Sequence, residues 1–120
     1  MIDWSRIRWF ERWEFGENGD IQPDPNLLRK LDAARGLAGV PFVINSGIRS
    51  EARNAEVGGV DTSAHLTGHA VDIRCTTSRE RFLIVSALRT VGFQRIGIGR
   101  TFVHCDTDPG KDQDVIWLYD

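Results

Sequence analysis

The stretch "SAHLTGHAVDI", residues 63–73, places two histidines and an aspartate close together in the sequence. Asp72 lies within "AVDIRC" (70–75), which otherwise has the apolar character of a buried β-strand. A buried carboxylate costs several kcal/mol unless another group pairs with it. The position of Asp72 therefore predicts a partner on the same face of its strand.

A second strand offers that partner. Side chains alternate between the two faces of a strand, so His104 and Asp106 of "TFVHCD" (101–106) share one face. If the two strands lie near each other, Asp72 and His104 converge. His65, in the loop before the first strand, can fold back over the same point. These residues predict a polar cluster on one face of a sheet.

Two imidazoles and one carboxylate form a common catalytic zinc set, which leaves a fourth coordination position open for water. Zn²⁺ held by His65, Asp72 and His104 would neutralise the carboxylate and remove its burial cost. One alternative is a buried His–Asp hydrogen-bond network without metal. His69 competes with His65 as a ligand, but its strand parity opposes that of Asp72, so we interpret it as a strand-entry residue.

The rest of the chain predicts an α+β fold. Strands joined by short turns indicate a mostly antiparallel sheet with helices packed on one face. Residues 46–63 lack a regular period and contain several glycines, so we expect a long organised loop of the kind that often carries function. The expected helices span residues 4–15, 25–38 and 78–91, and the expected strands span residues 40–45, 70–75, 93–99, 101–106 and 115–119.

Capping residues and periodicity support these helices. Asp24 and Pro25 are typical of a helix start and Gly39 of a helix end. Thr77 and Glu80 have the spacing of a capping box. The first helix is predicted from apolar residues at three-residue steps, and its tryptophans are interpreted as core residues. The expected apolar residues are Ile7, Phe10 and Trp13 in the first helix, and Leu27, Leu28, Leu31, Ala34 and Leu37 in the second.

Composition limits the classes of function. The 120-residue chain is 41% hydrophobic and 27% charged, with a net charge of −2, which is typical of one soluble globular domain over residues 1–120. A nucleic-acid-binding protein usually has a basic face, so we expect no nucleic-acid partner. No apolar run approaches the ~20 residues of a membrane span, so we expect no membrane partner.

The two cysteines, Cys75 and Cys105, form no CxxC metal motif. Both are predicted to project away from the metal-facing side of the sheet, and neighbouring strands would bring them close together. We expect two small buried hydrophobic residues, with a disulfide as the alternative.

The sequence also resembles that of a known family. Ser63, His65, Gly68, Ala70 and Asp72 match the SxHxxGxAxD motif of the M15 zinc peptidases, the group of D-Ala-D-Ala carboxypeptidases and phage endolysins. The similarity extends along most of the chain in the same order. The further matching segments are "WFERWEF" (9–15), "SGIRSEARN" (46–54), "VGG" (57–59), "FVHCD" (102–106) and "VIWLY" (115–119).

The resemblance implies an M15/hedgehog-like fold with a zinc site on the sheet, where His65, Asp72 and His104 hold Zn²⁺. It also implies hydrolysis of stem peptides or cross-links in bacterial peptidoglycan by a monomer. The opening residues, 1–13, have no apolar region or cleavage site of a secretory signal. We therefore expect a chain made in the cytoplasm without its own signal peptide and delivered to the cell wall by a phage or prophage.

The resemblance also implies roles for residues outside the metal set. Arg49 corresponds to an arginine that faces the substrate, where a guanidinium can pair with a carboxylate or polarise the scissile carbonyl. The alternative for Arg49 is a salt bridge that fixes its loop. Ser63 and Asn54 are assigned to substrate binding with Arg49.

One position departs from the family pattern. Many members carry Glu or Asp three residues before the last histidine ligand as the catalytic base, and this chain has Thr101 there. The expected base is then Asp106, two residues beyond His104, unless Asp106 only caps the following turn. If no residue replaces the base, the chain is a catalytically silent zinc domain that binds wall peptides or has a structural role.

Overall fold

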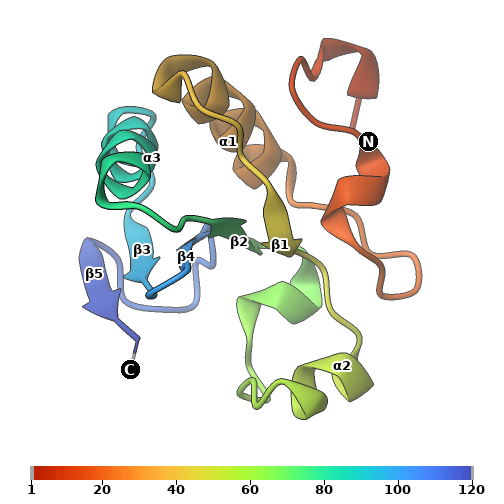
Figure 1. The fold of residues 1–120 in the computed structure, drawn as a ribbon. Coiled ribbons are helices and arrows are strands. Elements are labelled where there is room, and N and C mark those ends of the chain that lie inside the picture. The colour runs from red at the N-terminus through yellow and green to blue at the C-terminus, as the bar shows by residue number, and fades with distance from the viewer. Residues whose placement is uncertain (1, 120) are drawn as a thin grey trace.

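A computed structural model describes residues 2–119. Within these residues the structure contains one five-stranded sheet, three α-helices and three short 3-10 helices (Figure 1). The helices are α1 (Pro25–Ala38), α2 (Glu51–Glu56), α3 (Ser78–Thr90), η1 (Trp4–Arg6), η2 (Arg12–Phe15) and η3 (Ala64–Thr67). The strands are β1 (Ile44–Ser46), β2 (Ala70–Arg74), β3 (Arg95–Ile98), β4 (Phe102–Asp106) and β5 (Val115–Leu118).

The sheet is mixed but mostly antiparallel. Its strand order is β1-β2-β4-β3-β5, and the pairs β1–β2, β2–β4 and β3–β4 are antiparallel. Residues 107–114 carry the chain past β3, so that β5 lies on the other side of β3 from β4. β5 runs opposite to β4 and therefore parallel to β3. The α+β class expected from the sequence is confirmed, with one parallel pairing added at the edge.

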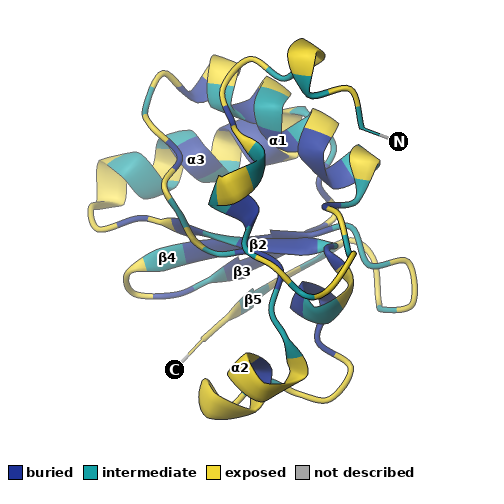
Figure 2. Ribbon diagram, turned by 90° about the vertical axis from the view of Figure 1, so that its right-hand side faces the viewer, coloured by how far each residue is buried: buried dark blue, intermediate teal, exposed yellow. Residues whose placement is uncertain are grey.

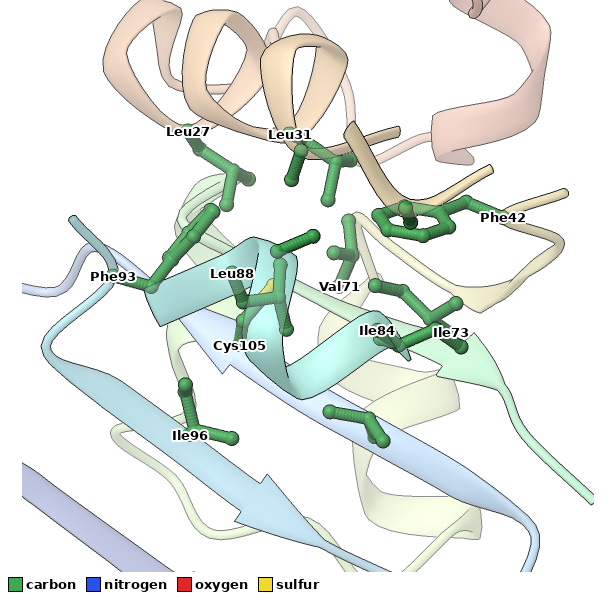
Figure 3. Packing of buried hydrophobic residues seen from close by; sticks show 14 of the residues in the cluster. Leu27, Leu31, Phe42, Val71, Ile73, Ile84, Leu88, Phe93, Ile96 and Cys105 are labelled. Carbon is green, nitrogen blue, oxygen red and sulfur yellow. The ribbon is translucent and has the colours of Figure 1, made fainter. Parts of the chain in front are cut away.

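One face of the sheet is covered by α1 and α3, and α2 lies on the opposite side (Figure 2). Between the helices and the sheet lies the apolar core (Figure 3). No helix within residues 2–119 combines the length and apolarity that a membrane crossing requires. Core side chains labelled in Figure 3 include Leu27, Leu31, Phe42, Val71, Ile73, Ile84, Leu88, Phe93, Ile96 and Cys105.

The two long helices begin as the sequence predicts. The Asp24 carboxylate accepts a hydrogen bond from the Leu27 amide at 3.1 Å, and the Thr77 hydroxyl accepts one from the Glu80 amide at 3.1 Å. Gly39 ends α1 in the left-handed region at φ 71°, which favours glycine. The predicted burial of Leu37 is wrong: it is exposed, and Ala38 occupies the core position instead.

The N-terminal segment does not form the predicted amphipathic helix. It consists of two separate 3-10 turns, and between them Asp32 of α1 accepts hydrogen bonds from the amides of Arg8 and Trp9 at 3.0 and 2.8 Å. Steps of three residues drift steadily around an α-helix and instead match the 3-10 period. Trp13 is consequently 76% exposed, and its interpretation as a core residue is wrong.

Two further predictions are corrected between α1 and β2. The first strand spans Ile44–Ser46 rather than residues 40–45, and the segment before it includes Pro41, which has no amide hydrogen for a sheet. The predicted loop 46–63 contains a helix, α2, whose start is capped by the Ser50 hydroxyl accepting from the Arg53 amide at 3.1 Å.

Cys75 and Cys105 are free and buried, and they are not close together. The register pairs Cys105 with Val71, whereas the Cys75 amide bonds to the Thr101 carbonyl. Four residues of β4 therefore separate the two positions, or about 13 Å along an extended strand. The predicted proximity is wrong, and the cysteines serve as two separate apolar core residues.

Candidate metal centre

One row of residues crosses the face of the sheet opposite α1 and α3. Ser46 of β1 pairs with Asp72 of β2, which pairs with His104 of β4, then with Gly97 of β3 and Trp117 of β5. Because paired residues in neighbouring strands project to the same side, this row collects the polar groups that strand parity predicts. The predicted convergence of Asp72 and His104 is confirmed.

Three side chains meet at the middle of this row. The Asp72 Oδ1 atom lies 2.9 Å from His104 Nδ1 and 3.4 Å from His65 Nε2. One ligand atom from each of the three residues lies within 4.8 Å of the others. In a tetrahedral zinc site with bonds of about 2.0–2.2 Å, two ligand atoms lie about 3.3–3.5 Å apart. The donor set and these distances can accommodate a metal ion such as zinc.

Both imidazole rings are fixed by their other nitrogen. His65 Nδ1 bonds to the Gly47 carbonyl at 2.7 Å, and His104 Nε2 bonds to Asp106 Oδ2 at 2.7 Å. A backbone carbonyl and a carboxylate are the usual partners that orient a metal-binding histidine. Each ring therefore presents its remaining nitrogen to Asp72.

The charges of the site are coupled. Burial alone would raise the pKa of Asp72, but hydrogen bonds from His104 and His65 outweigh it and hold that pKa well below its usual range. Burial alone would lower the pKa of His104, yet its contacts with Asp106 and Asp72 raise it. The two carboxylates thus favour positive charge at His104, and a bound cation would satisfy the same carboxylates.

Asp106 lies behind His104 and is buried. Its Oδ2 atom bonds to His104 Nε2, and its Oδ1 atom accepts from Arg95 Nε at 2.7 Å and from the Asp108 amide at 3.1 Å. Burial alone would raise the pKa of Asp106. The hydrogen bond and charge of His104, together with the Asp108 amide and the charge of Arg95, outweigh burial and lower that pKa. Both carboxylate oxygens therefore have partners within the protein.

Arg95 is a buried member of this cluster that the sequence interpretation missed. Besides Asp106, it donates to the Asp112 carbonyl, and its guanidinium lies 4.9 Å from the centre of the Trp117 ring. The register places Arg95 beside Asp106 because β3 is antiparallel to β4. Nothing in "FQRIGIG" separates this arginine from an exposed one.

Arg49 reaches the metal centre from the loop before α2. It donates to Ser46 Oγ at 2.9 Å, to Asn54 Oδ1 at 3.1 Å and to Asp72 Oδ2 at 3.4 Å. Its guanidinium is thus placed at the edge of the site and also ties its loop to β1 and β2. The geometry is therefore compatible with both roles considered from the sequence, contact with a substrate and a salt bridge that fixes the loop.

Asn54 and Ser63 make internal hydrogen bonds in this structure. Asn54 accepts from Arg49 and donates to the Val60 carbonyl at 2.8 Å, so it spans the loop after α2. A side chain at Gly59 would overlap the Asn54 carboxamide, so this turn requires glycine. Ser63 Oγ accepts from the His65 amide at 3.3 Å and caps η3. Both residues position the ligands and Arg49.

An aromatic wall, made of Trp117 and Tyr119, stands over β3. Their rings lie 5.4 and 6.2 Å from the His104 ring. A Cβ atom at Gly97 would lie 2.5 Å from Tyr119 and 2.8 Å from Trp117, so the wall folds over a position without a side chain. Alternation in "VIWLY" places both aromatics on one face, and that signal could have identified them.

Two residues considered from the sequence lie outside the centre. His69 bonds to Thr67 Oγ1 at 2.8 Å and approaches Asp24 at 4.0 Å, away from Asp72, as its parity predicts. Thr101 is exposed, and its carbonyl accepts from the Cys75 amide. The position that carries a base in many M15 peptidases therefore contributes nothing to this site.

The metal centre forms part of the floor of an open cleft of about 590 Å³. The segment with α2 lines one side, and β5 with the loop 107–114 lines the other. Its size and its mixed polar and apolar lining suit a short peptide segment. The charged, imidazole and aromatic side chains of the lining include Arg49, Arg53, Asp72, Arg95, His104, Asp106, Lys111, Trp117 and Tyr119.

Comparisons with known proteins agree with this description. The chain matches the family described as Peptidase M15 over residues 9–106. Among solved structures it is similar to the L-Ala D-Glu endopeptidase ChiX of Serratia marcescens, with a TM-score of 0.55 and 25% sequence identity. That similarity covers 88% of this chain and 96% of that chain. The search of curated proteins gave no match.

Proposed function

The chain belongs to the peptidase M15 family, and from this premise we propose that it is a zinc-dependent peptidase that cleaves peptides of bacterial peptidoglycan. The observation that carries the proposal is the centre formed by His65, Asp72 and His104. Both histidines are oriented by a second partner, and the centre opens into a cleft. A buried polar network needs no such opening, which favours the metal interpretation over the network alone.

Zinc in this centre would supply a Lewis acid and a water of lowered pKa. Asp72 offers its Oδ1 atom to the centre while Arg49 binds its Oδ2 atom. The remaining guanidinium surface of Arg49 faces the cleft, where it can donate to a substrate carbonyl. Trp117 and Tyr119 exclude water from one side of the bound peptide.

For Asp106 the geometry favours a positioning role over the predicted role as base. Its two oxygens hold His104 and Arg95, and the carboxylate lies at the ring nitrogen that points away from Asp72. Such a carboxylate fixes the orientation of a histidine ligand and raises its basicity. The base role remains a prediction, and the two roles differ in their effect on metal affinity.

A specific observation also supports a second candidate, a catalytically silent zinc domain. Within residues 2–119, the carboxylates that line the cleft are Asp72 and Asp106, and both have other partners. A wall-binding or structural domain would need the fold and the metal but no base.

The substrate is proposed from the similar structure and from the family. ChiX is named for an L-Ala–D-Glu bond, and we propose that this chain cleaves a bond of the same kind in stem peptides. Its place of action would then be the bacterial cell wall, reached by a phage- or prophage-encoded route.

Purified protein should be tested for metal content and for peptide release from isolated peptidoglycan, with mass spectrometry of the products. We expect one zinc per chain, loss of activity with chelator and recovery with zinc. His65→Ala is the control, because Asp72 keeps His104 and Arg49 as partners. Bound zinc without peptide release would support the silent domain, and neither metal nor release would contradict both candidates.

A further inference from the structure

Basic side chains outnumber acidic ones in the lining of the cleft, although the chain as a whole is slightly acidic. Four basic side chains line it, from Arg49, Arg53, Arg95 and Lys111, against the two carboxylates described above, whereas the net charge of the chain is −2. A cleft lined by one sign of charge attracts ligands of the opposite sign. Each of the four basic groups also has a carboxylate neighbour, so the excess in the lining favours an anionic ligand only where a basic group keeps a free donor.

The three arginines have other partners. Arg49 makes hydrogen bonds to three residues, and Arg95 is held by Asp106, by the Asp112 carbonyl and by the Trp117 ring. Arg53 pairs with Glu56 at 3.0 Å, and its side chain is 64% exposed at the rim. Arg95 is buried, Arg53 is exposed and Arg49 is already assigned to the substrate carbonyl. Lys111 is therefore the partly buried basic group of the cleft that has no role so far.

The Lys111 ammonium joins the two sides of the cleft. Nζ donates to the Thr62 carbonyl at 2.8 Å and lies 3.3 Å from Asp108 Oδ2, and its side chain is 29% exposed. An ammonium has three donors, so one remains for a ligand. The partial burial strengthens a charge-assisted hydrogen bond made there relative to one in water.

The loop that carries Lys111 is fixed before any ligand arrives. The Asp108 amide bonds to Asp106, and Gln113 donates to the carbonyls of Asp108 and Lys111 at 3.0 and 2.8 Å. Arg95 donates a hydrogen bond to the Asp112 carbonyl. A preorganised lysine loses little conformational entropy on binding, which favours affinity.

We propose that Lys111 forms a carboxylate-binding subsite beside the metal centre, which gives the cleft a preference for peptides with a free carboxylate next to the scissile bond. The inference rests on the proposed peptidase function. The carboxylate can belong to an acidic residue or to the end of the peptide, and both present the same anion to Nζ. Asp108 is a competing anion within the protein and limits the preference.

Matched peptides test the subsite. In the first pair, one peptide contains an L-Ala–D-Glu bond and the other an L-Ala–D-Gln bond. In the second pair, the same peptide is made with a free or with an amidated C-terminus. Lys111→Met should lower kcat/KM for the preferred acid about tenfold more than for its amide, because one charge-assisted hydrogen bond is lost. Lys111→Arg should retain the preference, and Asp108→Asn should increase it. The pair that responds identifies the source of the carboxylate.

The control is Arg53→Met, another basic residue of the cleft, which should keep the acid-to-amide ratio within about twofold of the parent. An equal loss for acid and amide in Lys111→Met would show that the lysine only ties the loops together, and would overturn the subsite. Calorimetry with the same peptides separates this from failure of the peptidase function. If the acid peptides bind more tightly than the amides without being cleaved, and Lys111→Met removes this difference, the subsite is supported and only the peptidase function fails. Equal binding of acids and amides would reject the subsite.

Discussion

The two faces of β2 and β4 differ although they share one backbone. Val71 and Ile73 of β2 are fully buried under α1 and α3, whereas Asp72 between them faces the cleft. In β4, Val103 and Cys105 lie in the core, whereas His104 faces Asp72. The helix-covered face supplies apolar burial, and the cleft face supplies charges held by specific partners.

This difference separates stability from chemistry at the level of single residues. On the covered face, the free energy comes from removing apolar area from water, and side chains of similar volume can replace one another. On the cleft face, each buried charge needs its partner, so a change of one atom leaves a charge uncompensated. Neighbouring residues in sequence should therefore respond to substitution in different ways.

The largest effect is expected from a metal ligand. His65→Ala should lower zinc affinity by about 10³-fold or more, since losing even an outer partner of a ligand typically costs about 10–100-fold. Asp72 keeps two partners, so circular dichroism should show an intact fold. Metal titration measures the affinity. Retention of zinc would show that the centre is not assembled as described.

Ile73→Ala sharpens the comparison from the other side of the strand. Its side chain lies in the core next to Asp72 in sequence, and its truncation should lower the free energy of unfolding by about 2–5 kcal/mol. The zinc affinity of the folded variant should stay within about twofold of the parent. Urea denaturation and metal titration give the two values. A large loss of zinc affinity would mean that the faces are coupled.

Asp106→Asn tests whether the carboxylate positions His104 or acts as the base. An amide has one acceptor oxygen, so it cannot serve both His104 and Arg95 as the two carboxylate oxygens do. The positioning role predicts a loss of zinc affinity of about 10–100-fold. The base role predicts unchanged zinc affinity and a kcat reduced by about 10²-fold or more. Affinity and kcat measured on the zinc-saturated variant decide between them.

The smallest effect is expected at the aromatic wall. Gly97→Ala places a methyl group against Trp117 and Tyr119, and both rings can shift toward solvent, so the strain should cost about 1 kcal/mol. Tryptophan fluorescence should change, and KM should rise more than kcat falls. Leu118→Ala, at an 80% exposed position on the other face of β5, is the matched control and should stay within about 0.5 kcal/mol. Equal effects of both changes would show that the wall does not contact the substrate.

The sequence was most informative where strand alternation determines which residues share a face. The parity of residues 70–75 and 101–106 correctly separates Asp72 and His104 from Val71 and Val103, because the period of two holds in any strand pairing. The helix caps at Asp24 and Thr77 were also predictable, since capping depends on residues only a few positions apart.

What escaped prediction depends on contacts between distant segments. Arg95 joins the site because β3 pairs with β4, and the register of that pair is not visible within either strand. In the same way, the register between β2 and β4 separates Cys75 from Cys105. The N-terminal turns depend on Asp32, which bonds to amides that an isolated segment would give to water. Such bonds override local periodicity.

The ladder between β2 and β4 has a consequence for the order of events in folding. Asp72 and His104 are 32 residues apart in the chain, with the whole of α3 between them. Closing that span costs entropy before any contact across the ladder is gained, so the pairing forms late relative to local helices. The centre therefore comes into existence only when β2 and β4 have paired, and metal uptake during refolding would mark a late step of folding rather than its nucleation.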